Sequence, residues 1–200
     1  SEGLHRQIFD YAKEKGIDCF STPSHYSDIE LLERLGMEVY KIGADDATNL
    51  PFLNKIARLN KPIILSTGMC TLEEVHEAVN AILSTGNRQL AVLHTVGNYP
   101  TYPEEVNLKV IDTYKREFPD LVIGYSDHTL GVFSCMCAAI LGAEIIEKHF
   151  TYDKKADGPD HMLSATKDEL KYMIDRIREY EIMRGTGIKA PVGNEIIDRE

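Results

Sequence analysis

The sequence predicts an α/β protein built around a parallel sheet, either a doubly wound sheet or a (β/α)8 barrel. Two observations support this. Short β-branched runs bounded by glycine, proline or asparagine recur six times along the 200 residues, and each is followed by a segment with helical apolar spacing. These runs are almost continuously apolar, as expected for strands that crossover helices bury on both faces. Periodicity alone does not distinguish the two architectures.

The elements follow one another in a regular order after an opening helix at residues 4–15. Strands are predicted at 17–21, 38–42, 62–67, 90–95, 121–126 and 144–150, and their helices at 28–35, 51–59, 72–83, 104–118, 131–141 and 167–183. Four helix starts carry a Ser/Thr-x-x-Glu capping box, beginning at Ser27, Thr71, Thr101 and Thr166. These boxes give the firmest predicted boundaries.

Chain length bears on the barrel alternative. A complete (β/α)8 barrel takes about 250 residues, and only six strands are visible in this sequence. If the fold is a barrel, residues 1–184 form a partial (β/α)8 TIM barrel with six of the eight β/α units, lacking the first two strands. Residues 185–200 have no apolar period and are predicted to be a linker. We therefore expect the chain to be a piece of a longer protein.

The composition excludes several classes of partner. The chain has 32 Asp and Glu against 22 Lys and Arg, for a formal charge of -10, so neither nucleic acid nor an anionic membrane surface is an expected partner. Its longest apolar runs are far shorter than the roughly 18 to 20 residues that cross a bilayer. The four cysteines lack the spacing of a disulfide scaffold or metal knuckle, which indicates reduced thiols in a cytoplasmic protein.

Polar residues follow nearly every predicted strand, at the edge where parallel α/β folds bind ligands. His128 and His149 end neighbouring strands, which lie about 4.8 Å apart, so both imidazoles are within reach of one divalent ion such as Mn, Fe, Co or Zn. His94 is a further ligand or a hydrogen-bond partner. The alternative is that these histidines are satisfied polar residues at strand ends.

A second polar group surrounds Lys41, which lies within a predicted strand. A buried lysine calls for an anionic partner, and Ser66 with the following Thr-Gly turn offers hydroxyl and N–H donors. Together they indicate a phosphate or carboxylate cradle, with a buried pair between Lys41 and Asp46 as the alternative. Downstream, a Gly-Pro turn holds Asp160 near the site, where it either binds substrate hydroxyls or is structural.

Six motifs, in order and spacing over almost the whole chain, resemble the sialic acid synthase family. They are Phe20-Ser-Thr-Pro23, Tyr40-Lys-Ile-Gly43, Pro62-Ile-Ile-Leu-Ser-Thr-Gly-Met69, Gly124-Tyr-Ser-Asp-His-Thr-Leu130, Glu147-Lys-His-Phe150 and Gly158-Pro-Asp-His161. The resemblance implies a (β/α)8 barrel. It also implies condensation of phosphoenolpyruvate with an N-acetylmannosamine-type amino sugar, which gives a nonulosonic (sialic) acid and phosphate in surface polysaccharide biosynthesis.

The resemblance further implies a role for each matched residue. A divalent ion, usually Mn, is expected on His128 and His149, where it polarises the sugar aldehyde. Phosphoenolpyruvate is expected on Thr22, Lys41, Ser66 and Ser126, with Asp46 as a catalytic carboxylate and Lys41 offsetting phosphate charge, and the sugar is expected on Tyr99 and Asp160.

The chain departs from the family pattern in places. Ala44 stands where many members have a phosphate-binding serine, Asp46 replaces a more frequent glutamate, and the segment from His94 to Tyr99 is altered. Family members also use two further strands and a C-terminal antifreeze-like domain from a partner subunit, which implies a homodimer. We therefore expect these 200 residues alone to have little or no turnover.

Three alternative functions remain at this stage. One is condensation with a different amino sugar, such as a legionaminic, pseudaminic or spore-coat precursor. Another is a metal-dependent hydrolase, because two strand-end histidines with Asp46 are able to activate water. The last is a catalytically inactive sugar-phosphate binding protein.

Overall fold

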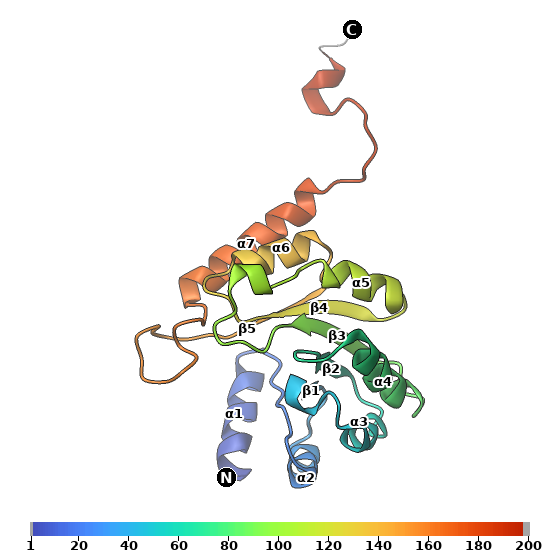
Figure 1. Ribbon diagram of the computed structural model, residues 1–200. Helices are drawn as coiled ribbons and strands as arrows, with labels where there is room; N and C mark the ends of the chain where they lie inside the picture. The colour runs from blue at the N-terminus through green and yellow to red at the C-terminus, as the bar shows by residue number, and fades with distance from the viewer. Residues whose placement is uncertain (1, 198–200) are drawn as a thin grey trace.

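The computed structural model describes residues 2–197 and shows a parallel α/β fold. Five strands form one sheet in the order β1-β2-β3-β4-β5, and every neighbouring pair is parallel. The strands are β1 (Tyr40–Ile42), β2 (Ile63–Ser66), β3 (Leu90–Thr95), β4 (Val122–Asp127) and β5 (Ile145–Lys148). Because the spatial order follows the chain without reversal and the sheet curls (Figure 1), the fold is a half-barrel rather than a doubly wound sheet.

The first predicted strand, at residues 17–21, is largely absent. It contributes a single parallel bridge, between Ser21 and Tyr40. Ile17 and Phe20 are 66% and 42% exposed, so the segment lacks the burial that its apolar sequence predicted. The described residues therefore contain five strands, with only an isolated bridge in place of the first predicted strand, and the predicted count of six β/α units is not confirmed.

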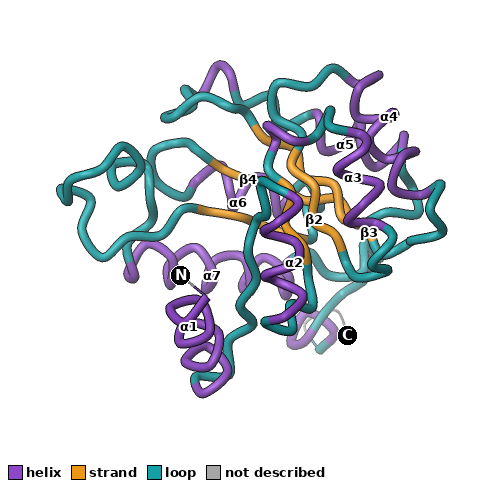
Figure 2. The backbone as a smooth tube through the Cα atoms, turned by 90° about the horizontal axis from the view of Figure 1, so that it is seen from below, coloured by secondary structure: helices purple, strands orange, loops and turns teal. Residues whose placement is uncertain are grey.

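Helices form the outer layer around the curled sheet (Figure 2). They are α1 (Glu2–Glu14), α2 (Tyr26–Arg34), α3 (Leu50–Ala57), α4 (Leu72–Leu83), α5 (Val110–Glu117), α6 (Phe133–Ile140) and α7 (Lys167–Met183), with short 3₁₀ turns η1 (Ala44–Asp46), η2 (Pro103–Glu105) and η3 (Gly193–Ile196). The alternation of strand and helix that the sequence predicted is confirmed from β1 onward.

Two of the four predicted capping boxes are confirmed. Thr71 and Thr166 cap α4 and α7, and each accepts a hydrogen bond from the backbone N–H of the glutamate three residues later. That glutamate accepts in return from the backbone N–H of the threonine, Glu74 at 2.7 Å and Glu169 at 2.9 Å. The motif works here because both partners are local in sequence.

The other two predicted boxes are wrong. Helix α2 begins before Ser27, because Asp28 accepts from the backbone N–H groups of Ser24 and His25. Thr101 pairs with Thr129 in an isolated parallel bridge. The helix predicted at 104–118 is instead divided into η2 and α5.

The main core lies between the sheet and helices α2 to α6, and β3 at its centre is buried along its whole length. Gly124 in β4 permits close approach of the neighbouring strand, since a Cβ there would lie 2.7 Å from the carbonyl oxygen of Ile145. A smaller cluster of Val132, Cys135, Ala165 and Met173 packs beneath α7. Strand β5 is only half-buried, as expected at the edge of the sheet.

Beyond α7, residues 185–197 extend away from the body and include η3 (Figure 1). The rest of the predicted 185–200 linker, residues 198–200, and residue 1 lie outside the described residues. Among residues 2–197, no helix has both the length and the apolar character needed to cross a bilayer.

Candidate active site

A cavity of about 350 Å³ opens at the carboxyl ends of the strands. Its wall includes Lys41 at β1, Ser66 at β2, Thr95 at β3, Ser126 at β4 and Glu147 at β5. The polar residues that end successive strands in the sequence therefore meet at one place, as expected for a parallel barrel.

Lys41 is buried at the base of this cavity. Its ammonium donates hydrogen bonds to the Ser66 hydroxyl at 2.8 Å and to the Ile42 carbonyl at 2.9 Å, and it lies 3.7 Å from a carboxylate oxygen of Glu147. Burial lowers the pKa of Lys41, against the opposing effect of Glu147. The alternative pairing with Asp46 is wrong, because the neighbouring carboxylate is Glu147.

Ser126 and Glu147 are cross-strand neighbours in the β4–β5 register. The Ser126 hydroxyl donates a hydrogen bond of 2.6 Å to the Glu147 carboxylate. No function was expected of Glu147 from the sequence, although two signals were present. Glu147 lies two residues before His149, and therefore on the same strand face, and it follows an apolar pair in an edge strand.

The two predicted metal ligands lie close together, with ring centroids 5.3 Å apart. His128 donates its Nδ1 hydrogen to the Val96 carbonyl at 2.7 Å, because a carbonyl only accepts. The Nε2 lone pair is therefore left for an ion, the arrangement usual for metal-binding histidine. Burial lowers the pKa of His128 and outweighs the Val96 hydrogen bond, which raises it. The net lowering favours the neutral imidazole.

Within residues 2–197, no three His, Cys, Asp or Glu side chains are grouped closely enough to hold an ion by themselves. His94 does not join the pair, since its Nε2 hydrogen-bonds the Val106 carbonyl at 2.8 Å. His128 and His149 together therefore fit an ion that takes its remaining ligands from substrate or water.

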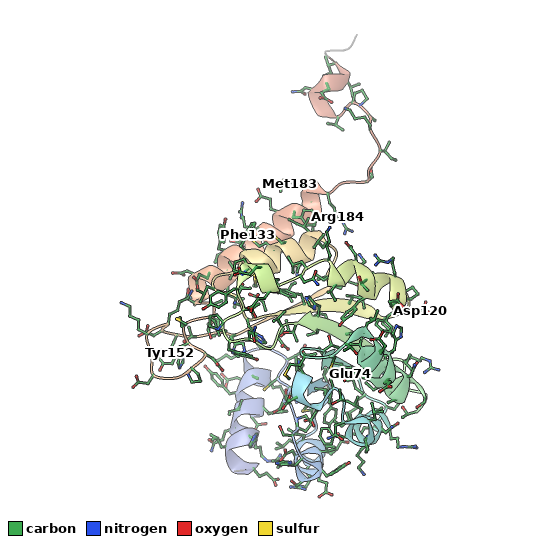
Figure 3. All side chains as sticks on the ribbon, viewed as in Figure 1. Glu74, Asp120, Phe133, Tyr152, Met183 and Arg184 are labelled. Atoms are coloured by element: carbon green, nitrogen blue, oxygen red, sulfur yellow. The ribbon has the colours of Figure 1, made fainter. Side chains whose placement is uncertain are left out.

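The predicted sugar ligands surround the histidines. Tyr99 lines the cavity and stacks on His128 with ring centroids 3.9 Å apart. Asp160 lies 3.8 Å from Nδ1 of His149. It belongs to the loop between β5 and α7, which carries the exposed Tyr152 at the side of the molecule (Figure 3).

Four predicted residues do not line the cavity: His149 and Asp160, which lie beside His128 as described above, and Thr22 and Asp46. Thr22 lies near Gly43, which does line the cavity: the Thr22 methyl group would be 3.9 Å from a Cβ on Gly43. Asp46 lies in η1 and accepts a hydrogen bond from the Asn49 side chain, whereas its neighbour Asp45 lines the cavity. The roles assigned to Thr22 and Asp46 stay predictions.

Thr95 is a site residue that the sequence analysis missed. Its hydroxyl is the only buried side-chain N or O atom in the described part of the chain that has no hydrogen-bond partner. Most buried polar groups are paired, so an unpaired one on the wall of a polar cavity is a candidate ligand group. A Cβ on Gly68 would lie 3.0 Å from the Thr95 methyl and 3.2 Å from Ala44, so glycine is what fits between them.

These features define an α/β half-barrel with a polar cavity at its strand ends, lined by Lys41, His128 and the carboxylates of Asp45 and Glu147. The model of the NeuB family matches residues 1–189. The chain belongs to the NeuB family.

Two curated relatives are named for the synthesis of a sugar acid and of spore coat polysaccharide. The chain is 44% identical over 187 residues to N,N'-diacetyllegionaminic acid synthase of Campylobacter jejuni, covering 92% of this chain and 56% of that protein. It is 41% identical to spore coat polysaccharide biosynthesis protein SpsE of Bacillus subtilis, covering 95% and 51%. The chain thus spans slightly more than half the length of these curated relatives.

A solved structure supports the same grouping. The fold matches the crystal structure of N-acetylneuraminic acid synthetase from Leptospira borgpetersenii, determined in complex with citrate, with a TM-score of 0.92 at 30% sequence identity. The match covers 100% of this chain and 69% of that one. The fold expected from the family resemblance, a partial TIM barrel, is confirmed at the level of a curled parallel half-barrel.

Proposed function

We propose that the protein carrying this chain condenses phosphoenolpyruvate with an N-acetylmannosamine-type amino sugar, giving a nonulosonic acid and phosphate for surface polysaccharide biosynthesis. Membership of the NeuB family and the named activities of the relatives support this function. The observation that carries it is the presence of buried Lys41 and of His128 in one cavity at the strand ends, with the His149 ring edge-on to His128 at a centroid distance of 5.3 Å.

Lys41, Ser66 and Ser126 are proposed to hold phosphoenolpyruvate, together with Thr22. Lysine has three N–H donors, and Lys41 uses two of them on Ser66 and Ile42. The third is left for Glu147 or for an anionic substrate. A bound phosphate or carboxylate would stabilise the charged lysine that burial disfavours, so binding and the charge of Lys41 support each other.

His128 and His149 are proposed to hold the divalent ion, which we expect to be Mn. The fit rests on the Val96 hydrogen bond, which leaves the Nε2 atom of His128 unprotonated. When bound, such an ion supplies Lewis-acid polarisation of the sugar aldehyde. Tyr99 and Asp160, which flank the histidines, are proposed to contact the sugar.

The proposed reaction joins C3 of phosphoenolpyruvate to the aldehyde carbon, and the aldehyde oxygen takes a proton. Water adds at C2 and loses one proton, which leaves a C2 hydroxyl. The C2–O bond to phosphate then breaks, phosphate leaves, and the hydroxyl gives up its remaining proton as the C2 ketone forms. Lys41 offsets the charge of phosphate and carboxylate throughout. Asp46 is proposed as the catalytic carboxylate, and Glu147 and Asp45, which line the cavity, lie where they could accept the proton of water.

The wider context of the protein is part of the same proposal. The acceptor sugar binds beside a C-terminal domain of a partner subunit, reached through a linker at residues 185–200, so the enzyme is a homodimer. We place it in the cytoplasm, in line with four cysteines that form no disulfide. The 200 residues alone are expected to have little or no turnover.

The test is mass spectrometry of products from the full-length protein given phosphoenolpyruvate, Mn and a panel of 2-acetamido sugars. We expect phosphate release that requires both substrates, together with an acid whose mass identifies the acceptor. Phosphate release from phosphoenolpyruvate alone would instead indicate a hydrolase, and binding without product would indicate an inactive binding protein. Either result would contradict the proposed condensation.

A further inference from the structure

We infer that Asp127 and Lys148 form a clamp on the outer face of β4 and β5 that positions His128, which lines the cavity, and His149 beside it. Side chains alternate along a strand, so Asp127 points away from the cavity that its neighbours Ser126 and His128 face. Lys148 is placed in the same way between Glu147 and His149. The inference rests on the proposed function only for what the histidines bind.

The two residues of the clamp are direct cross-strand neighbours in the β4–β5 register. The Lys148 ammonium lies 2.7 Å from a carboxylate oxygen of Asp127, and their side chains are 2% and 0% exposed. The same ammonium donates to the Thr129 carbonyl at 2.5 Å. Lys148 therefore holds the chain on both sides of His128.

The carboxylate of Asp127 is saturated with donors. One oxygen accepts from the Tyr125 hydroxyl at 2.8 Å, the Ser134 hydroxyl at 2.8 Å and the Thr129 N–H at 3.1 Å. The other accepts from Lys148 and from the Thr129 hydroxyl, the latter at 3.1 Å. These contacts join the end of β4 to helix α6 and to β5, and they fix the geometry of all three.

The clamp lies where the β4–β5 pairing ends. Asp127 and Lys148 are the last residues of β4 and β5, so His128 and His149 lie one residue beyond the paired ladder. Each histidine also accepts a hydrogen bond at its backbone carbonyl from a loop N–H. Thr101 donates to His128 at 3.0 Å, and Ala165 donates to His149 at 2.7 Å. Neither amide links one histidine to the other, whereas the clamp does.

Stability alone accounts poorly for such a pair. A buried ion pair costs desolvation of both charges, and well-packed apolar residues of similar volume often replace it without loss. A role in geometry is therefore the better reason for a buried, saturated pair between two ligand residues. Lys148 and Asp127 are positioning residues, since they do not line the cavity.

The experiment uses the full-length protein with selectively ¹⁵N-labelled histidine. Three variants are compared: Lys148→Met, the neutral double variant Asp127→Asn/Lys148→Met, and the control Lys61→Met. Lys61 is a matched control because it also pairs with a carboxylate, Glu33 at 2.6 Å, and a backbone carbonyl, Met37 at 2.6 Å, near the opposite end of the strands. The double variant leaves no unpaired buried charge, so it remains informative if Lys148→Met does not fold.

We expect the imidazole NMR signals of His128 and His149, assigned by single substitutions, to shift in the clamp variants and to stay unchanged in Lys61→Met. We also expect Mn binding, followed by calorimetry, to weaken at least tenfold in the clamp variants and less than twofold in the control. Unchanged imidazole signals in the folded double variant would overturn the clamp. If the signals shift but wild-type protein binds no Mn, the clamp stands and the proposed metal site fails.

Discussion

Two buried lysines on opposite sides of the same sheet have different surroundings. Lys148, on the outer side, makes an ion pair of 2.7 Å with a carboxylate that has five further donors from protein hydroxyl, N–H and thiol groups. Lys41, on the cavity side, lies 3.7 Å from its nearest carboxylate and retains a donor. On the outer side, the charged groups are paired within the protein and fix the positions of β4 and β5. On the cavity side, Lys41 keeps a hydrogen-bond donor available for a ligand.

The largest expected effect on stability is that of Lys148→Met. It leaves the Asp127 carboxylate buried without its counter-charge, and breaking a buried pair in this way costs about 3 to 5 kcal/mol. Urea unfolding of variant and wild type measures this loss in the free energy of unfolding. A loss below about 1 kcal/mol would show that Asp127 does not depend on Lys148.

The opposite behaviour is expected of Lys41→Met. Activity should fall about 10²- to 10³-fold, the usual cost of removing one donor from a developing charge. The free energy of unfolding should stay the same or rise, because burial disfavours the charged lysine. Steady-state kinetics and urea unfolding of the same sample test both parts, and a variant as unstable as Lys148→Met would remove the contrast between the two sides.

Thr95→Val sharpens the same contrast with a smaller change. It replaces an unpartnered buried hydroxyl by a methyl group of similar shape, so we expect the free energy of unfolding to rise by about 1 kcal/mol. Thr95→Ser, which keeps the hydroxyl, is the matched control and should show no such gain. A destabilised valine variant would mean that the hydroxyl has a partner in solution.

The smallest expected effect is on the pH dependence of stability. Because the pKa of Lys41 is lower in the folded than in the unfolded protein, the unfolded chain binds more protons between the folded pKa and the ordinary lysine value of 10.5. The stability of wild type should therefore rise relative to Lys41→Met as the pH is raised through that range. Thermal unfolding of both proteins at pH 7 to 10 measures this, and a relative fall would give the wrong sign.

Much of this architecture follows from local sequence. The strands β1 to β5 are short apolar runs, and their polar ends meet because parallel strands share one edge. The boxes at Thr71 and Thr166 were predictable because a capping box is closed by residues three apart. The failure of residues 17–21 to form a strand was not predictable in this way. A strand forms through pairing, and this segment pairs with β1 at one residue only.

The site was predictable in its residue types and less so in its details. Lys41, Ser66, Ser126 and the two histidines follow from strand ends and from the family motifs. Whether Asp45 or Asp46 faces the cavity depends on the 3₁₀ turn η1, whose direction no strand period determines. The missing partner of the Thr95 hydroxyl is likewise a property of packing rather than of any motif.

The central claim is that the cavity beside Lys41 holds phosphoenolpyruvate next to an ion on the two histidines. Paramagnetic relaxation of the ³¹P signal of phosphoenolpyruvate, on titration of the full-length protein with Mn, tests it directly. We predict strong relaxation in wild type that is lost in both His128→Ala and Lys41→Met and retained in His76→Ala, a histidine on the outer helix α4. Equal relaxation in wild type and His128→Ala would contradict the claim.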